Sequence, residues 1–177
     1  MDALLPVSLI PSSKKFARWF GSSKVTDADG KPLAMFHGSA RHFREFRGED
    51  GFYFSSDAKY AAGYGKRQAE HEAEDEGEEV EPVLYSVFLS IRRPLELVGE
   101  NNEDWEQYTG WGFEPSGLPQ YDGVIMRYAD GEVEAMAFHP SQVWIFGKNG
   151  RPFKPDEDFS EPEYAMLDGV VVKLRGV

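Results

Sequence analysis

The chain contains no cysteine among its 177 residues, which excludes disulfide bonds and thiolate ligands for a metal. It has no apolar run of roughly 18 residues or more, so no segment is expected to span a membrane. Basic residues are also scarce, since 19 Lys and Arg stand against 31 Asp and Glu, for a formal net charge of −12. This charge opposes avid, non-specific binding to nucleic acid or to an anionic membrane, but it leaves room for a small basic site.

Hydrophobic residues make up 41% and aromatic residues 14% of the chain. For a chain of this length, that content is enough to build one ordinary core with a large share of β-structure. We therefore expect residues 1–177 to form a single domain and a monomer, with residues 148–177 as a C-terminal arm. We expect it to act in the cytoplasm, either of its own cell or of a host or target cell into which it is delivered.

The segment 51–64 is predicted to be a strand that runs into a short helix. Its aromatic start, around Tyr53, suits a pleated, half-buried surface. Ser55 or Ser56 is the expected helix cap, and the helix places Tyr64 over the same small space as Tyr53. Two aromatic rings that face one gap could clamp a flat ligand. The alternative is an ordinary β-α corner of the core.

A second segment places a carboxylate in a strand. Residues 124–128 and 132–138 are predicted to be strands joined by a tight hairpin at Asp130-Gly131. Because side chains alternate along a strand, Glu134 lies in line with the apolar Met136. A carboxylate in that position is costly unless it has partners or water, which favours a functional Glu134. The alternative is an edge strand on which Glu134 faces solvent.

Charged residues gather in two further places. Arg41, Arg44 and Arg47 form a local positive patch, which is either a solvated loop or a site for a diphosphate. Residues 70–81 contain eight acidic residues in twelve and no apolar face. They are predicted to be a solvated or disordered excursion, and a metal site is the alternative that their composition allows.

Three motifs occur in order along the chain. They are His-Gly-Ser at 37–39, Gly-Phe-Tyr-Phe at 51–54 with a tyrosine eleven residues after the first, and Glu134 followed by an aromatic residue, Pro, Gln and Val. This order resembles the His-Tyr-Glu class of ADP-ribosyltransferases, which includes diphtheria-toxin-like toxins and the poly(ADP-ribose) polymerases.

A wider pattern narrows the resemblance. Arg-Trp-Phe-Gly-x-Ser-Lys-Val at 18–25, Gly-Lys-Pro-Leu at 30–33 and Tyr-Asp-Gly-Val-Ile at 121–125 are similar to the ADP-ribosyltransferase domain of phage polyvalent proteins and related bacterial effectors. The resemblance covers about residues 14–147. It implies an α+β fold, an ADP-ribosyltransferase-like split β-sandwich of two antiparallel sheets with a few short helices and an NAD cleft between the sheets.

The resemblance also implies roles for single residues. His37 would bind a ribose hydroxyl of NAD, the main chain of Gly38 would bind the nicotinamide amide, and Tyr53 and Tyr64 would stack about the nicotinamide ring. The catalytic residues would be Glu134, His37 and Tyr53, and the NAD-binding residues would be His37, Gly38, Ser39, Arg41, Tyr53 and Tyr64.

The sequence departs from the class at one position. The polymerases have a serine where this chain has Ala61, so the hydroxyl that holds the carboxamide is absent there. Ser55, Ser56 or Tyr60 are the candidates to replace it. Glu132-Val133-Glu134 also resembles the Glu-x-Glu of arginine-specific transferases, but the serine motif of those enzymes is missing. An arginine acceptor is therefore not inferred.

The residues also suit the chemistry when the family is set aside. Cleavage of the bond between ribose and nicotinamide builds up oxocarbenium character, which a buried carboxylate such as Glu134 can stabilise. Glu132, at the hairpin end, could orient or deprotonate an acceptor, and its alternative is a solvated glutamate. We expect mono-ADP-ribosyl transfer from NAD to a protein or nucleic acid, without a metal. The alternatives are an NAD glycohydrolase and a catalytically silent NAD- or ADP-ribose-binding module.

Overall fold

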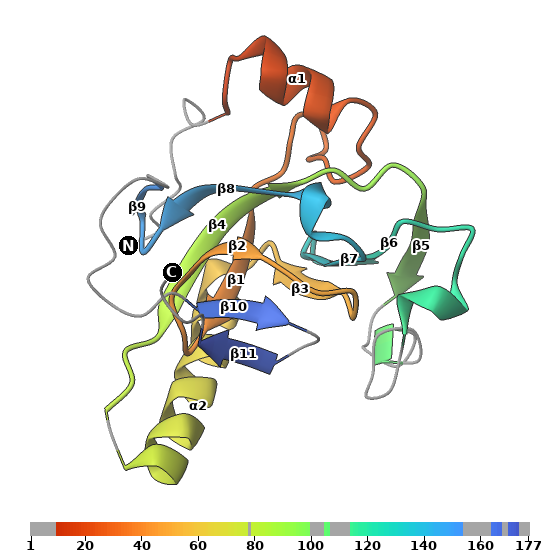
Figure 1. Cartoon of the computed structure of the whole chain (residues 1–177). Coiled ribbons are helices and arrows are strands. Elements are labelled where there is room, and N and C mark those ends of the chain that lie inside the picture. Colours follow the sequence, from red (N-terminus) through yellow and green to blue (C-terminus); the bar gives the residue numbers. More distant parts are fainter. Residues whose placement is uncertain are drawn as a thin grey trace.

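The computed structural model describes residues 10–77, 79–99, 105–106, 114–153, 164–167 and 170–173 (Figure 1). The helices in these residues are α1 (Lys14–Phe20) and α2 (Ala58–Glu76), with the 3₁₀ turns η2 (Pro115–Gly117) and η3 (Pro140–Gln142). The strands are β1 (Met35–Ser39), β2 (Phe43–Phe46), β3 (Phe52–Ser55), β4 (Val83–Leu89), β5 (Pro94–Gly99), β6 (Gly123–Tyr128), β7 (Val133–Ala137), β8 (Val143–Lys148), β9 (Arg151–Pro152), β10 (Tyr164–Leu167) and β11 (Val170–Lys173).

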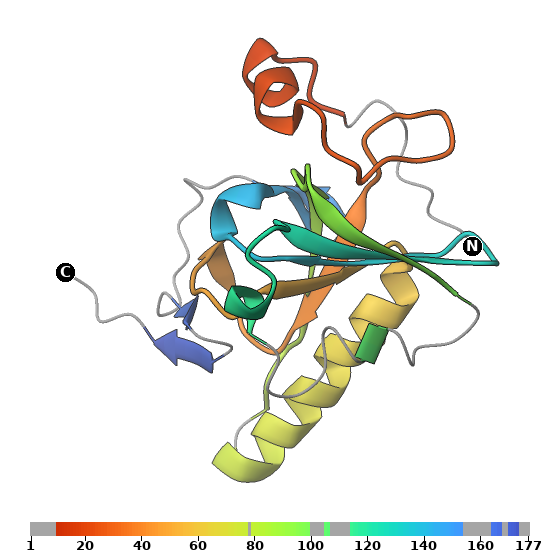
Figure 2. The same cartoon turned by 90° about the vertical axis from the view of Figure 1, so that its right-hand side faces the viewer.

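Two sheets organise the chain, which confirms the predicted α+β fold. The larger sheet has the order β5-β6-β7-β3-β1-β4-β8-β9, and the smaller has the order β11-β10-β2. Strand pairs are antiparallel except β5 with β6 and β10 with β2, which are parallel. Figures 1 and 2 show α2 against one side of the large sheet and β10–β11 beside β2 on the other.

The core follows from strands that are apolar on both faces. β4 lies between β1 and β8 in the large sheet, and six of its seven side chains are buried, because α1 and α2 pack against it from one side and β2 from the other. On α1, Ser13 Oγ accepts a hydrogen bond from the main-chain N–H of Phe16 at 3.1 Å and so caps the helix. Phe16 then packs edge-on against Phe88 of β4.

The large sheet splits between β1 and β3. β1 pairs with β4 along its whole length, from Met35 to Ser39, but its described pairing with β3 consists of Phe36 opposite Ser55. Since the strands are antiparallel, they diverge from that point toward Ser39 on β1 and Phe52 on β3. We call this opening the fork. The fork therefore lies within the large sheet, between the strands that carry two of the three motifs.

Helix α2 differs from its prediction in two respects. Its N-cap is Asp57, whose carboxylate accepts hydrogen bonds from the N–H groups of Lys59 and Tyr60 at 2.8 and 3.2 Å, so neither serine is the cap. It is also 19 residues long rather than short, and it ends where Gly77 adopts a left-handed conformation with φ of 71°.

The predicted solvated excursion at 70–81 is therefore wrong for residues 70–76, which are helical. Composition misled the prediction because Ala and Glu are strong helix formers, and a helix that has already formed extends readily through such residues. Ion pairs also reduce the repulsion. Lys66 lies 3.7 Å from Glu70 one turn away, and Arg41 lies 2.5 Å from Glu72.

One tyrosine hydroxyl links β2 of the small sheet to β4 of the large sheet. Tyr85 of β4 is fully buried, and its hydroxyl accepts a hydrogen bond from the N–H of Phe43 and donates one to its carbonyl, at 2.5 and 2.8 Å. The two rings also stack with centroids 4.3 Å apart. β2 therefore pairs with β10 within its own sheet and is tied to the large sheet by the Tyr85 side chain.

We predict that Tyr85→Phe lowers the free energy of unfolding by about 1–3 kcal/mol, because both buried main-chain groups of Phe43 lose their partner. Urea unfolding of the two proteins measures the change. Tyr121→Phe is the control, since Tyr121 is half-buried against the same sheet and its hydroxyl has no hydrogen bond to a described residue. Equal stability of the Tyr85→Phe protein and the wild type would contradict this account of β2.

Candidate active site

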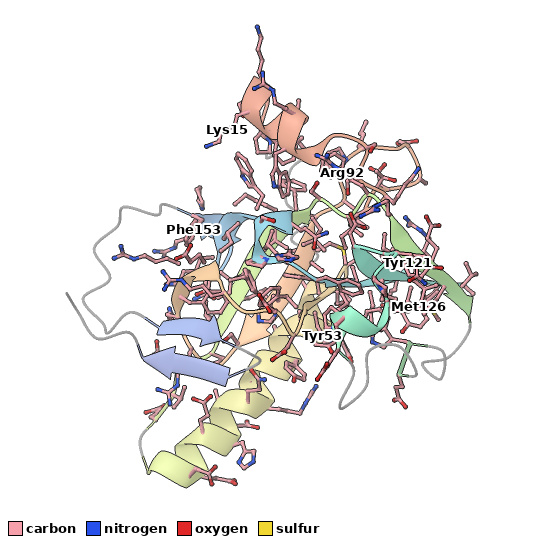
Figure 3. All side chains as sticks on the ribbon, turned by 45° about the vertical axis from the view of Figure 1, so that its right-hand side comes forward. Lys15, Tyr53, Arg92, Tyr121, Met126 and Phe153 are labelled. Atoms are coloured by element: carbon pink, nitrogen blue, oxygen red, sulfur yellow. The ribbon has the colours of Figure 1, made fainter. Side chains whose placement is uncertain are left out.

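Glu134 lies at the centre of the large sheet with a set of aromatic neighbours. Register places it beside Ser55 on one side and Met126 on the other. Because side chains alternate, Tyr53 on β3 and Tyr128 on β6 point to the same side as Glu134. We call this side the Glu134 face; Figure 3 shows Tyr53 and Met126 close to each other there, near the start of α2.

Tyr128 is the contact that sequence reasoning missed. Its hydroxyl donates a hydrogen bond to Oε2 of Glu134. The signal was present in the sequence, because the hairpin at Asp130-Gly131 was predicted. A tight turn there places Tyr128 opposite Glu132, which lies two residues from Glu134 and therefore on the same face. The hairpin is confirmed by hydrogen bonds from Tyr128 N to Glu132 O and from Gly131 N to Tyr128 O, at 2.9 and 3.0 Å.

The surroundings of Glu134 favour its protonated form, so its pKa lies above that of an ordinary glutamate. The pKa of Glu134 is raised chiefly by burial and, to a smaller extent, by the charge of Glu132, while the hydrogen bond from Tyr128 lowers it. Glu132 itself lies exposed at the hairpin end, and its pKa is raised by desolvation and by Asp130 and Asp57. The predicted acceptor residue is therefore near the catalytic candidate, on the solvent side of it.

Three exposed tyrosines flank this carboxylate. Tyr53, Tyr60 and Tyr64 expose 41%, 51% and 48% of their surface, which is unusual for large aromatic side chains. Burial raises the pKa of Tyr53, and the nearby Tyr64 adds to this rise; burial and then the charge of Glu134 raise the pKa of Tyr60. The structure thus brings together the two predicted stacking residues, although they come from a strand and a helix.

Trp105 is the buried aromatic side chain that contacts Tyr53. Its ring meets Tyr53 edge-on with centroids 6.4 Å apart, and it belongs to an apolar cluster under the Glu134 face. The cluster consists of Trp105, Val124, Met126, Met136 and Phe138. One side of the Tyr53 ring is therefore supported by packed apolar side chains, and the other is exposed.

His37 lies on the other face of the sheet. Its neighbour Phe36 pairs with Ser55 and so shares the Glu134 face, which turns the His37 ring toward Phe46 and Phe54 at 5.1 and 5.6 Å. The sequence did not predict this separation. The link between the two faces is the fork, where Nδ1 of His37 lies 2.8 Å from the carbonyl oxygen of Tyr53.

The protonation of His37 follows from that contact. A carbonyl oxygen only accepts, so Nδ1 carries the hydrogen. Burial lowers the pKa of His37, against a smaller raising effect of the Tyr53 hydrogen bond, which keeps the ring neutral. Nε2 is then an acceptor, and it is buried without a hydrogen-bond partner among the described residues. An unpaired buried acceptor costs free energy that a ligand hydroxyl would recover.

Gly38 lies where β1 and α2 approach most closely. A Cβ atom on Gly38 would lie 1.9 Å from the carbonyl oxygen of Ala61, and one on Gly65 would lie 2.7 Å from the N of Ser39. The two main chains touch because neither residue has a side chain. Ala61 therefore meets β1 through its main chain.

The remaining predicted residues have structural partners. Ser39 is buried and its Oγ accepts from Arg41 N at 3.1 Å, while the guanidinium of Arg41 pairs with Glu72 of α2. Ser55 Oγ accepts from Asp57 N, and Ser56 Oγ accepts from the main chain of β7 at 2.8 Å. Of the two serine hydroxyls considered as replacements at the carboxamide, that of Ser55 thus holds the turn before α2 and that of Ser56 holds the end of β3 against β7.

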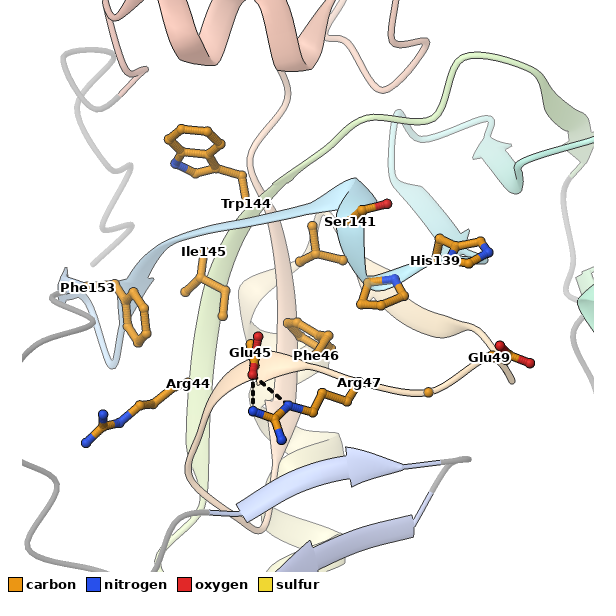
Figure 4. A pocket seen from close by; sticks show the side chains of 13 residues that line it. Arg44, Glu45, Phe46, Arg47, Glu49, His139, Ser141, Trp144, Ile145 and Phe153 are labelled. Carbon is orange, nitrogen blue, oxygen red and sulfur yellow. Dashed lines mark hydrogen bonds and ion pairs between the residues drawn. The ribbon is translucent and has the colours of Figure 1, made fainter. Parts of the chain in front are cut away.

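Two cavities lie elsewhere. The larger, of about 1100 Å³, lies between β2 and β8, where Glu45 pairs with Arg47 (Figure 4). A second, of about 940 Å³, lies around Asp122 and Gln142. Neither of these two cavities is lined by a predicted catalytic residue. In the described part of the chain, no three His, Asp or Glu side chains are grouped as a metal site requires, and no helix is long and apolar enough to cross a membrane.

A two-sheet α+β fold with a split central sheet and an aromatic-flanked glutamate is that of the ADP-ribosyltransferases. A family model described as the ADP-ribosyltransferase in polyvalent proteins matches residues 27–151. The chain belongs to this family, which confirms the resemblance drawn from the sequence. No curated protein matches the chain.

We predict that Gly38→Ala lowers the free energy of unfolding by about 1–3 kcal/mol or more, because two main chains must separate to admit a methyl group. Gly63→Ala is the matched control on α2. A Cβ there meets only the end of the Arg67 side chain at 3.5 Å, and the gain in helix propensity should stabilise the protein by up to about 1 kcal/mol. Thermal unfolding that moves in the same direction for both variants would contradict the close approach.

Proposed function

We propose that this member of the family is a mono-ADP-ribosyltransferase that cleaves NAD, releases nicotinamide and transfers ADP-ribose to a macromolecular acceptor. The observation that carries the proposal is Glu134, a half-buried carboxylate held by the Tyr128 hydroxyl among the exposed rings of Tyr53, Tyr60 and Tyr64. A binding module has no need of an ionisable group in so costly a position.

Glu134 would act when the bond between nicotinamide and ribose breaks. Positive charge then develops at the anomeric carbon, and a fixed carboxylate stabilises that charge more than it stabilises the neutral sugar. The carboxylate could also accept a hydrogen bond from the ribose 2′-hydroxyl, which strengthens as charge develops. Glu134 would be needed in its ionised form, although its pKa is raised.

The nicotinamide ring would stack between Tyr53 and Tyr64. Both rings are exposed on the same side and lie near each other, and Trp105 supports Tyr53 from below. Gly38 would offer its main chain to the amide, since that part of β1 borders the fork. Loss of one stacked ring from such a clamp costs about 1–3 kcal/mol of binding free energy.

His37 would receive a ribose hydroxyl on Nε2. The support for this role is the unpaired, unprotonated Nε2 and the place of the ring in the fork. A ligand that contacts both Glu134 and His37 would have to pass through the fork, since the two side chains lie on opposite faces. Closure of the fork around NAD would hold the reacting bond in a fixed orientation.

Arg41 would bind the diphosphate, and Glu72 would compete with it. The two side chains already form an ion pair at 2.5 Å, so NAD would have to exchange one anionic partner of Arg41 for another.

Glu132 would face the incoming acceptor, because it is exposed two residues from Glu134 on the same face. We further propose that residues 1–177 act as one domain and a monomer in a cytoplasm, as a phage protein or an effector.

The experiment that tests the function is incubation of the purified protein with labelled NAD and host lysate, followed by separate protease and nuclease digestion of the labelled material. Label lost on protease digestion alone would identify a protein acceptor, and label lost on nuclease digestion alone would identify a nucleic acid. Nicotinamide release with no labelled macromolecule would show glycohydrolysis instead. Release of no nicotinamide, with NAD bound, would leave the protein as a binding module.

We predict that Glu134→Gln lowers transfer on the order of 10²-fold or more while it leaves NAD affinity nearly unchanged. In the wild type, activity should fall as pH drops through the raised pKa of Glu134, because the protonated form does not stabilise a cation. At neutral pH the variant should be at least as heat-stable as the wild type, since the folded state no longer contains an unfavourable charge. Wild-type activity in the variant would exclude Glu134 as the catalytic residue.

We predict that His37→Asn weakens NAD binding without a large loss of stability. The Asn amide can still donate to the Tyr53 carbonyl, as Nδ1 does, but it has no atom in place of Nε2. Calorimetry with NAD measures the affinity.

Tyr64→Ala should weaken NAD binding, measured in the same way, by about 1–3 kcal/mol through lost stacking. Unchanged affinity in both proteins would contradict the proposed NAD site.

A further inference from the structure

The described side-chain hydrogen bond to Glu134 comes from Tyr128, and its geometry is set by main-chain contacts. β6 and β7 pair from Gly123 to Arg127, with Met126 directly opposite Glu134. Two residues further along the hairpin, Tyr128 donates its N–H to Glu132 O at 2.9 Å. The Tyr128 hydroxyl then reaches back to Oε2 of Glu134 on the same face.

We propose that Tyr128 is a positioning residue for Glu134, which fixes one carboxylate oxygen so that the other can face the reacting sugar. This role rests on the proposed function of Glu134. A carboxylate on a flexible side chain can rotate about its terminal torsion, and rotation would weaken its interaction with a developing cation. One hydrogen bond to Oε2 removes that freedom and leaves Oε1 for the substrate.

The Tyr128 ring is itself held in place. It packs, partly buried, against the apolar cluster that includes Trp105, Met126 and Met136. A group whose position is fixed by packing needs no reorganisation at the moment of reaction, which is the property that makes an electrostatic contact effective. Replacement by Phe keeps the packed ring and removes the hydroxyl alone.

Charge also favours this arrangement. Burial, followed by the hydrogen bond and the charge of Glu134, raises the pKa of Tyr128, so its hydroxyl stays a donor across the neutral range. The groups that face Glu134 are Tyr128 on β6, Glu132 in the turn before β7 and Tyr60 on α2, with Arg67 beyond Tyr60. Of the effects on Glu134, burial and Glu132 raise its pKa, and the hydrogen bond from Tyr128 lowers it. Tyr128 therefore helps to keep Glu134 ionised.

The test measures nicotinamide release by Tyr128→Phe across pH. We expect kcat to fall roughly 10- to 100-fold with little change in KM for NAD, since the contact matters most as charge develops. The acidic limb of the pH profile should move to higher pH, because the hydrogen bond that lowers the Glu134 pKa is lost. Glu132→Gln should move the same limb to lower pH, because it removes a charge that raises that pKa. Tyr121→Phe, a half-buried tyrosine without such a contact, should leave rate and profile unchanged.

Two further measurements separate positioning from a merely structural role. Carbon-13 NMR titration of the Glu134 carboxyl, assigned by its absence in Glu134→Gln, should give a higher pKa in Tyr128→Phe even without activity. In a Glu134→Gln background, Tyr128→Phe should cause little further loss of rate. Wild-type kcat and an unmoved Glu134 titration in Tyr128→Phe would overturn the positioning role. If instead Glu134→Gln retained activity, the proposed function itself would fail.

Discussion

The contact on which the site depends is the close approach of two main chains, those of β1 and α2. Gly38 and Gly65 face each other where any side chain would collide with the opposite backbone. This approach sets α2 against the large sheet, so that Tyr60 and Tyr64 reach the face that carries Glu134. The same segment of β1 borders the fork, so one pair of glycines fixes both the helix and the opening in the sheet.

The site combines a fixed carboxylate with surroundings that oppose its charge. Burial and Glu132 favour protonation of Glu134, while Tyr128 favours the ionised form. A group held in an unfavourable state by its surroundings is typical of functional sites, where structure is stabilised elsewhere. Here the apolar cluster around Trp105 and the strand pairing of β3, β7 and β6 supply that stability. The proposed chemistry would use the charge that the fold tolerates at this position.

His37 and Arg41 show that predicted ligand contacts already have protein partners. His37 uses Nδ1 to bridge the fork and keeps Nε2 unpaired, and Arg41 is held by Glu72. Binding of NAD would therefore give Nε2 of His37 a partner and would replace Glu72 as the partner of Arg41. Among the acidic residues of α2, Glu72 thus balances the charge of Arg41, two residues after the His-Gly-Ser motif.

The sequence by itself determined the family and its class of fold, through the resemblance of three ordered motifs, and the hairpin that carries Glu134, because side-chain alternation and turn residues act locally. Tertiary structure decided the length of α2, the face on which His37 lies and the partners of Arg41 and Glu134. Acidic composition predicted a solvated excursion at 70–81, but helix propensity, a cap at Asp57 and packing against β1 extended the helix. The register of the local β6–β7 hairpin joined Tyr128 to Glu134, whereas the pairing of β1 with β3 separated His37 from Glu134. The β1–β3 register arises from long-range pairing, which no local pattern contains.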